Sequence, residues 1–189
     1  IVFLRPLGLR LKGNNTVELS ISPMSIFAEI EPVYITGNFS VVPEKEGWSI
    51  STPQTSFTLG SWKEQQQPFY SWDMSYSKNY TVNNLTGRYA VKLNKWSGTV
   101  AEVYVNGQKA GIIAFDPWQL DVTPYLKEGD NNIDVHVIGS LKNLLGPHYK
   151  NPAPGLASPW HWKNVNKPIP GNEYQMMDYG LKEDFELIH

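Results

Sequence analysis

The sequence predicts an all-β domain in which two antiparallel sheets pack against each other. Short stretches of alternating apolar and polar residues recur between turns rich in Gly and Asn, and no helical pattern of useful length separates them. The 189 residues suffice for one β-sandwich with its own core, or for a sandwich with a small appendage, whereas two full domains would be tight.

The first thirty residues are predicted to form a separate hairpin and linker region. Alternating Leu7, Leu9 and Leu11 precede a turn at 13–15, and a second alternating run follows it. This hairpin would either close a preceding similar domain or form an edge of the present one. Residues 22–30 have some helical character, and the chain is expected to be a piece of a longer protein. The boundaries we predict are 1–30 for this region and 31–189 for the sandwich.

The first half of the sandwich is predicted to hold one long strand among several short ones. Residues 31–39 read as the entering strand, and 48–50 and 57–59 as short strands. In 74–82 the larger apolar residues share one face, and small polar residues share the other. The same alternation returns around Val91 after a Gly/Asn turn.

A β-hairpin is the strongest local prediction. Residues 101–105 alternate, and Asn106 and Gly107 supply the two positive φ angles of a type I′ turn. Residues 108–115 return as the partner strand. An aromatic crossing then leads to Asp121, whose side chain is expected to accept backbone N–H bonds locally.

The last third of the sequence combines one further strand, a long loop and a closing strand. Alternation at 133–137 places His136 on the face opposite Val135 and Val137, which predicts a solvent-facing or inter-element role. From 141 to 175 six prolines leave little room for a ladder, so a long loop is expected there. Phe185 and Leu187 then indicate a final strand.

The run from Tyr104 to Val137 resembles the sugar-binding jelly roll of family 2 and related glycoside hydrolases. In both, Val-Asn-Gly joins two strands, and an aromatic crossing, Asp-Val-Thr-x-x-Leu and a last alternating strand follow. A second block, residues 59–82, resembles the first half of the same domain, so the resemblance covers about half of the chain. Residues 143–149 and 178–181 resemble an extension in C-terminal domains of large bacterial, rhamnosidase-like, polysaccharide-degrading enzymes.

This resemblance implies a jelly-roll β-sandwich of the galactose-binding-like type with a long C-terminal loop. It also implies a non-catalytic carbohydrate-binding or accessory domain of a secreted or periplasmic glycoside hydrolase. The partners would be an oligo- or polysaccharide and the upstream catalytic domain of the same chain. One alternative is a purely structural domain that packs on the catalytic domain without binding sugar. The other, disfavoured, is a free-standing sugar-active enzyme.

Composition excludes other classes of partner. The formal net charge is −2 with no basic patch, so neither nucleic acid nor an anionic membrane surface is indicated. No apolar run is long enough for a membrane helix. The absence of cysteine excludes a disulfide framework and cysteine-ligated zinc but assigns no compartment. An extracytoplasmic location is implied by the resemblance alone.

Aromatic residues are the best candidates for sugar recognition, because the apolar face of a pyranose stacks on an aromatic plane. The predicted sugar-binding residues are Trp62, Gln66, Tyr70, Trp72, Trp118, Trp160, His161 and Trp162. The alternative for the tryptophans is that they fill the ends of the sandwich or face the catalytic domain.

No catalytic residue is predicted. The carboxylate pairs Asp116 with Asp121 and Glu64 with Asp73 have ordinary turn roles as their simpler interpretation. In the resembling enzymes the acid and base lie on a separate barrel.

A structural calcium is the one cofactor considered. Jelly-roll sugar-binding domains often hold one, and calcium takes oxygen ligands whose sequence spacing is not distinctive. Its weak candidate ligands are Asp178, Glu183 and Asp184.

Overall fold

The computed structural model describes residues 34–146, 148 and 169–189, together with 16, 18, 20, 22, 23 and 25–27. The chain divides into two compact units, residues 1–37 and 38–189. In the first unit, the described part of the predicted helix at 22–30 forms bends and a turn, in which Phe27 N–H donates to Ser25 Oγ at 3.1 Å. The predicted hairpin before it falls largely outside the described residues.

The first strand begins later than the sequence suggests. The prediction of a strand at 31–39 is wrong over 34–39, where the backbone is irregular and bends at 37–38. Pairing begins at Ser40, in the antiparallel hairpin of β1 (Ser40–Pro43) and β2 (Trp48–Ser51). Residues 33–35 are β-branched or aromatic and favour a strand, but such a run forms one only where a partner strand accepts its backbone hydrogen bonds.

The predicted short strand at 57–59 does not form either. Thr58 N–H donates to the side-chain Oε1 of Gln65 at 2.7 Å, so a side chain takes the place of a neighbouring strand. Gln65 ends η1 (Lys63–Gln65), a single turn of 3₁₀ helix.

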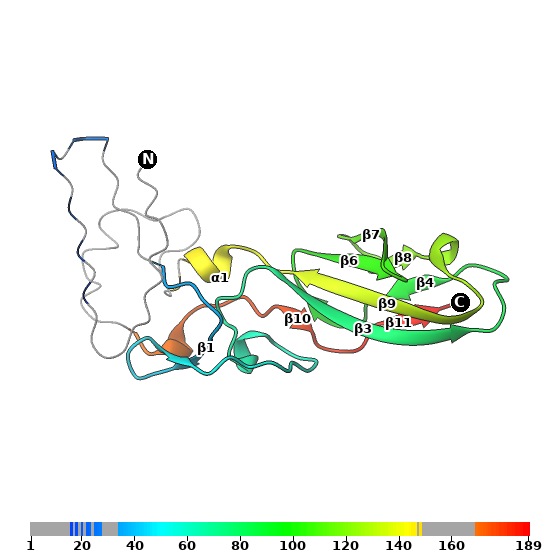
Figure 1. Ribbon diagram of the computed structural model, residues 1–189, viewed down its shortest axis with the longest axis horizontal. Coiled ribbons are helices and arrows are strands. Elements are labelled where there is room, and N and C mark those ends of the chain that lie inside the picture. Colours follow the sequence, from blue (N-terminus) through cyan, green and yellow to red (C-terminus); the bar gives the residue numbers. More distant parts are fainter. Residues whose placement is uncertain are drawn as a thin grey trace. The chain divides into compact units, whose positions relative to one another are not determined.

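A four-stranded antiparallel sheet dominates the second unit (Figure 1). Its order is β3 (Asp73–Val82), β9 (Gly129–Ile138), β6 (Val100–Val105) and β7 (Gln108–Ile113). Strands β3 and β9 pair over their full ten residues. The predicted hairpin is confirmed as β6–β7, since Asn106 and Gly107 have φ angles of 52° and 79°.

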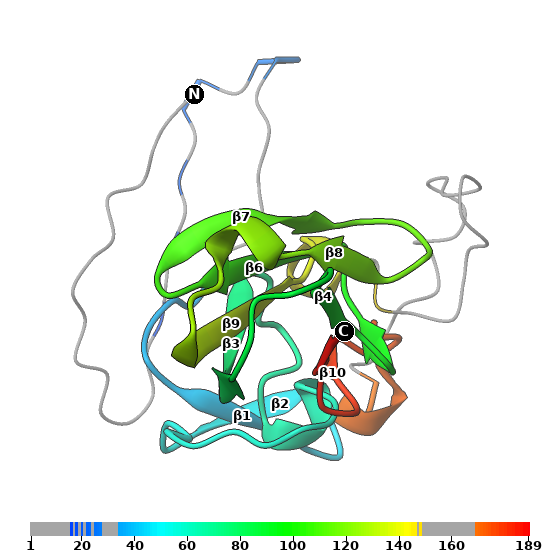
Figure 2. The same cartoon turned by 90° about the vertical axis from the view of Figure 1, so that its right-hand side faces the viewer.

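A smaller antiparallel sheet covers the inner face of the larger one. Its central strand is β4 (Ala90–Lys92), which pairs with β8 (Gln119–Asp121) and with the last strand, β11 (Glu186–Ile188). Figure 2 shows the C-terminal end of the chain beside β4 and the four strands of the larger sheet following one another across their layer. Two short strands, β5 (Trp96–Ser97) and β10 (Gly180–Leu181), pair alongside.

Both sheets contribute to one apolar core, as expected for an all-β sandwich. The buried members are Trp62, Val82, Val91, Leu93, Ala101, Val103, Val105, Ile113, Val122, Leu126, Ile133, Val135, Val137, Tyr179, Leu181 and Phe185. In β6 and β9 every second side chain points inward, which confirms the predicted alternation. His136 accordingly lies on the outer face, as predicted.

The region predicted to be a long loop contains two short helical turns in its described parts. These are α1 (Lys142–Leu145) and η3 (Gly171–Glu173). The buried Asn143 ties α1 to the returning chain, because its amide donates to Met177 O at 3.0 Å and accepts from Met177 N–H at 2.7 Å. Another turn, η2 (Thr123–Tyr125), follows β8. Within the described part of the chain, no helix is long and apolar enough to cross a membrane.

Candidate functional site

Aromatic side chains gather at one end of the sandwich. Strands β3 and β6 begin at this end and β9 and β7 finish there, because Asp73 pairs with Ile138 and Ala101 with Ile113. Five of the aromatic residues on the segments that join the strands here form what we call the aromatic end: Tyr70, Trp72, Trp96, Phe115 and Trp118. The polar hairpin turns at 83–87, 106–107 and 127–129 lie at the opposite end.

Four of these rings are accessible, and Tyr70, whose hydroxyl is bonded within its own loop, is 36% exposed. Trp72 is 73% exposed, Phe115 83% and Trp118 37%. The ring of Trp118 meets that of Trp96 edge to face, at 5.3 Å between centroids and 87° between planes. Since Trp96 packs against the core, it fixes the orientation of its more exposed neighbour. Trp72 precedes β3, where its carbonyl accepts a bond from Gly139 N–H at 3.0 Å.

Trp62 belongs to the core instead. It is 1% exposed, and its indole N–H donates to Tyr76 Oη at 2.8 Å. The rings of Tyr70 and Tyr179 pack against it at 5.7 and 5.8 Å. The prediction of Trp62 as a sugar-binding residue is therefore corrected: neither face of its ring is free, and it fills the sandwich as the alternative interpretation expected.

The neighbouring loop holds its polar groups internally. Tyr70 donates its hydroxyl proton to Asp73 O at 2.8 Å, and burial, followed by the nearby Asp73 carboxylate, raises the pKa of Tyr70. Gln66 takes a left-handed conformation, and its Oε1 accepts from Ser51 Oγ at 3.2 Å. Gln65 and Gln67 are bonded to Thr58 and Ser40. These bonds stabilise the loop and compete with hydroxyls of a ligand.

The remaining aromatic candidates, Trp160, His161 and Trp162, lie outside the described residues. A pocket among the described residues contains none of the candidates. It is lined by Pro43, Glu44, Lys45, Pro170, Asn172 and Glu173.

Carboxylates proposed for calcium are engaged with lysines. Asp178 pairs with Lys182 at 2.9 Å, and Asp184 pairs with Lys78 at 3.1 Å. Burial acts to raise the pKa of Asp178, but the nearby Ser61, Lys182 and Lys63 side chains together lower it. No group of three or more His, Asp or Glu side chains suited to a metal ion occurs among the residues that the structure describes. Asp178, Glu183 and Asp184 are thus not brought together as a ligand set.

Asp121 has the turn role that its sequence context predicts. Its Oδ1 accepts from the backbone N–H and hydroxyl of Thr123 at 3.0 and 2.7 Å, and Oδ2 lies 2.7 Å from Arg88 Nε. The bonds from Thr123, assisted by Arg88, lower the pKa of Asp121. This carboxylate therefore holds the first residue of η2 in position.

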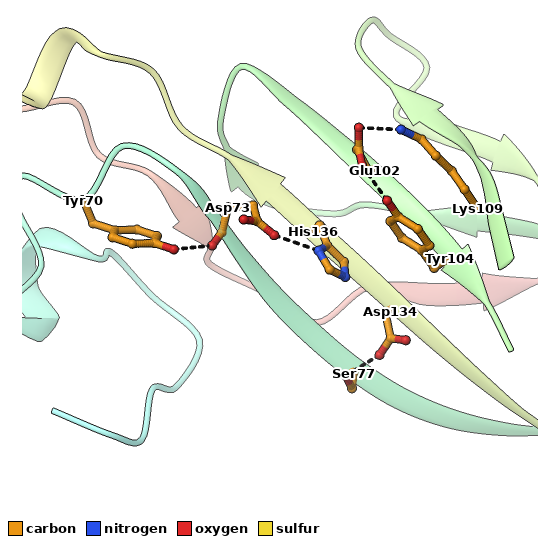
Figure 3. Close-up of polar contacts among 8 residues, drawn as sticks. All are labelled: Tyr70, Asp73, Ser77, Glu102, Tyr104, Lys109, Asp134 and His136. Carbon is orange, nitrogen blue, oxygen red and sulfur yellow. Dashed lines mark hydrogen bonds and ion pairs between the residues drawn. The ribbon is translucent and has the colours of Figure 1, made fainter. Parts of the chain in front are cut away.

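A row of polar contacts crosses the outer face of the four-stranded sheet (Figure 3). His136 Nδ1 lies 2.9 Å from Asp73 Oδ2, and its ring lies 4.8 Å from that of Tyr104. Tyr104 donates its hydroxyl proton to Glu102 Oε2 at 2.8 Å, while Lys109 Nζ lies 2.5 Å from Glu102 Oε1. On β3 and β9, Ser77 donates to Asp134. The hydrogen bonds from Lys109 and Tyr104 lower the pKa of Glu102.

Sequence reasoning placed His136 on this face but did not identify its neighbours. Asp73 is 63 residues away, and the two meet only because β3 and β9 pair in one register. The alternation of β6 does place Glu102 and Tyr104 together on one face. Knowledge of which strands are neighbours was the missing signal.

The chain is similar in sequence to a known protein. No family model matches this chain. It is 27% identical over 163 residues to a Formosa agariphila protein named "Putative beta-glucuronidase". The match covers 75% of this chain but 14% of that protein. The chain is thus similar to a small part of a protein named as a glycoside hydrolase.

Solved structures similar to this one are also named as glycoside hydrolases, but their backbones superpose on it only weakly. A rhamnosidase from Novosphingobium sp. PP1Y has a TM-score of 0.47 at 17% identity, over 85% of this chain and 16% of that one. A β-D-mannosidase from Dictyoglomus thermophilum has a TM-score of 0.39 at 18% identity, over 84% and 22%. Against these structures too, the chain spans less than a quarter of the length.

Proposed function

We propose that this chain is a non-catalytic, carbohydrate-binding accessory domain of an extracytoplasmic glycoside hydrolase, and that its sandwich is a jelly roll of the galactose-binding-like type. The similarity to part of a protein named as a glucuronidase supports the enzyme class. The observation that carries the binding function is the placement of three accessible rings, Trp72, Phe115 and Trp118, at one end of the sandwich.

Exposed tryptophans at a fixed position suit a saccharide ligand. A pyranose ring presents an apolar C–H face that packs on an aromatic plane, and its hydroxyls remain in water or bond to nearby polar groups. Trp72 adjoins β3 and Phe115 follows β7, which are the two edges of the four-stranded sheet. Three strand spacings separate these edges, or about 14 Å, so the rings would contact a chain of sugars rather than one ring.

A catalytic role is not part of this proposal. Glycoside hydrolysis needs two carboxyl groups on opposite sides of one bond. Asp121 is committed to Thr123 and Arg88, and Asp73 to His136. The catalytic residues would then belong to another part of the longer protein.

The experiment is affinity electrophoresis of the purified chain in gels that contain plant or microbial polysaccharides, with Trp72→Ala and Trp118→Ala as variants. Leu85→Ala is a matched control, because Leu85 is 38% exposed, close to the 37% of Trp118, but lies in a turn at the opposite end. Retardation that the tryptophan variants lose and the control keeps supports the proposal. A folded chain that no polysaccharide retards contradicts it.

A structural domain without sugar binding is the second candidate. Exposed aliphatic residues lie on the segment that follows β9, where Gly139 bonds to the carbonyl of Trp72 and where Leu141 and Leu145 are 58% and 55% exposed. Aliphatic side chains pack on protein surfaces but do not stack on sugars. Retention of polysaccharide binding in Leu141→Ser would separate this surface from the saccharide-binding one.

A further inference from the structure

Two rings stand side by side on the outer face of the four-stranded sheet, apart from the aromatic end. Tyr104 from β6 and His136 from β9 have centroids 4.8 Å apart, with planes tilted by 46° (Figure 3). The side chain of His136 is 28% exposed, and that of the adjoining Asp73 is 32%. The two rings therefore form a partly exposed apolar patch that is surrounded by polar side chains.

Both rings are held in position by polar bonds at their edges. Glu102 accepts from the Tyr104 hydroxyl at 2.8 Å and is itself held by Lys109 at 2.5 Å. Asp73 holds His136 from the other side at 2.9 Å. Rings that are already fixed lose little conformational entropy when a ligand packs on them, so the geometry is suited to binding.

The strand beside the rings carries short side chains. On β3, Ser75 pairs with His136 and Ser77 pairs with Asp134, which is in turn the partner of Tyr104. Serines leave the rings uncovered on this side, and Ser75 offers its hydroxyl group to a ligand. The outer face therefore presents rings flanked by hydrogen-bonding groups.

We propose that this face is a second saccharide-contacting surface, specific for an uncharged sugar chain. The inference rests on the proposed function and assigns it a further site and a ligand class. Three carboxylates, Asp73, Glu102 and Asp134, surround the rings, whereas Lys109 is the cation bonded within this cluster. Carboxylates accept hydrogen bonds from neutral sugar hydroxyls and repel the carboxylates of uronic acids.

The surface also continues toward the aromatic end. Tyr70 bonds to the carbonyl of Asp73, whose side chain holds His136, so the polar row runs from the loop before β3 onto the sheet (Figure 3). A sheet face is open rather than pocket-shaped, which suits an extended chain better than a free monosaccharide. A single saccharide chain contacting both Trp72 and Tyr104 is the arrangement this predicts.

The test is isothermal titration of the chain with neutral xylan or mannan oligosaccharides and with oligogalacturonate as the charged counterpart. Tyr104→Ala and His136→Ala should each weaken binding of the neutral ligand about fivefold or more, which corresponds to loss of one ring contact. Thr81→Ala is the matched control, since Thr81 lies on the same face of β3 but six residues beyond Ser75 and should bind as the unaltered chain does. Amide chemical shifts of 104 and 136 in the unaltered chain should move with the neutral ligand, which tests the site even where a variant folds poorly.

The outcomes separate this inference from the proposed function. Loss of binding in Trp118→Ala with full binding in Tyr104→Ala and unmoved signals at 104 and 136 overturns the second surface alone. Tighter binding of oligogalacturonate than of neutral chains overturns its ligand class. No binding of any saccharide to the folded chain overturns both.

Discussion

Asn106 and Asn131 join the turn of the β6–β7 hairpin to the start of β9. Asn106 Nδ2 donates to Asn131 Oδ1 at 2.9 Å, although 25 residues separate them. Asn131 is 1% exposed, and its amide also donates to Lys127 O at 2.8 Å and Gly129 O at 3.0 Å, while its Oδ1 accepts from Lys127 N–H at 3.0 Å. One buried side chain therefore closes the 127–131 turn and connects it to a neighbouring hairpin.

Asn131→Asp is expected to destabilise the domain by about 3 kcal/mol. The substitution replaces a donor with an acceptor, so the new oxygen would face the carbonyls of Lys127 and Gly129 without a proton to share. Urea unfolding followed by tryptophan fluorescence measures the change. Asn132→Asp, at an adjacent position on the outer face, should cost less than about 1 kcal/mol. Equal losses at the two positions would contradict the role assigned to Asn131.

Trp62→Ala and Trp72→Ala are expected to differ strongly in their effect on the stability of the domain. Trp62→Ala removes a ring that is 1% exposed and should cost about 4 kcal/mol, whereas Trp72→Ala at 73% exposed should change stability by less than about 0.5 kcal/mol. Thermal unfolding of both variants measures this difference. Trp62→Phe, which retains a ring but loses the bond to Tyr76, provides an intermediate case if Trp62→Ala does not fold. A large loss of stability in Trp72→Ala would place that ring in the core.

The sequence was sufficient to predict the elements whose signals are local. The Asn106-Gly107 turn needs only two residues that tolerate positive φ, and the alternation in β9 states directly which side chains face the core. The turn role of Asp121 follows in the same way from Thr123, two residues away. These predictions are confirmed because each depends on neighbours in the chain.

Features that depend on distant segments were not predictable. Residues 34–39 include side chains that favour a strand but form none with the described part of the chain, and the backbone N–H of Thr58 is bonded to the side chain of Gln65. Trp62 and Trp72 are both tryptophans in one loop region, and nothing local distinguishes the buried one from the exposed one. The contact of His136 with Asp73 needs the register of β3 on β9.

Gly180 and Gly107 are expected to differ in their tolerance of alanine. A Cβ at Gly180 would lie 2.3 Å from Gly60 O and 2.9 Å from Trp62 Cδ1, whereas nothing lies within 4 Å of one at Gly107. Both have positive φ, 127° and 79°, so the backbone penalty of about 1 kcal/mol applies to each. Gly180→Ala should therefore lower the free energy of unfolding by about 3 kcal/mol or more, because the new Cβ also clashes with Gly60 and Trp62. Gly107→Ala should lower it by about 1 kcal/mol. Chemical unfolding of the two variants checks the ratio, and similar losses would disagree with the close approach of β10 to Gly60.

Stability is expected to fall as the pH drops below about 6.5, because His148 is held in its neutral form. Its ring stacks on Tyr174 at 5.4 Å and meets Phe69 edge to face at 5.8 Å. Burial, assisted by the charge of Lys142, lowers the pKa of His148 below its usual 6.5, although the bond to Asn143 O acts in the opposite direction. The unfolded chain then binds a proton at a higher pH than the folded chain, so the free energy of unfolding declines as the pH falls through 6.5 and levels off below the lowered pKa.

His148→Phe should remove this decline while keeping a ring beside Tyr174, and His148→Gln should remove it while keeping a donor for Asn143 O. The measurement is urea unfolding of the three chains at several pH values between about 7.5 and 5, compared by slope rather than by absolute stability. Further acidification provides an internal control. The pKa values of the Glu102, Asp121 and Asp178 carboxyls are lowered in the folded state, so stability should fall in all three chains only below their usual values of 4.5 and 3.8. An unchanged slope near pH 6 in both variants would show that the decline arises elsewhere, since neither phenylalanine nor glutamine titrates in that range.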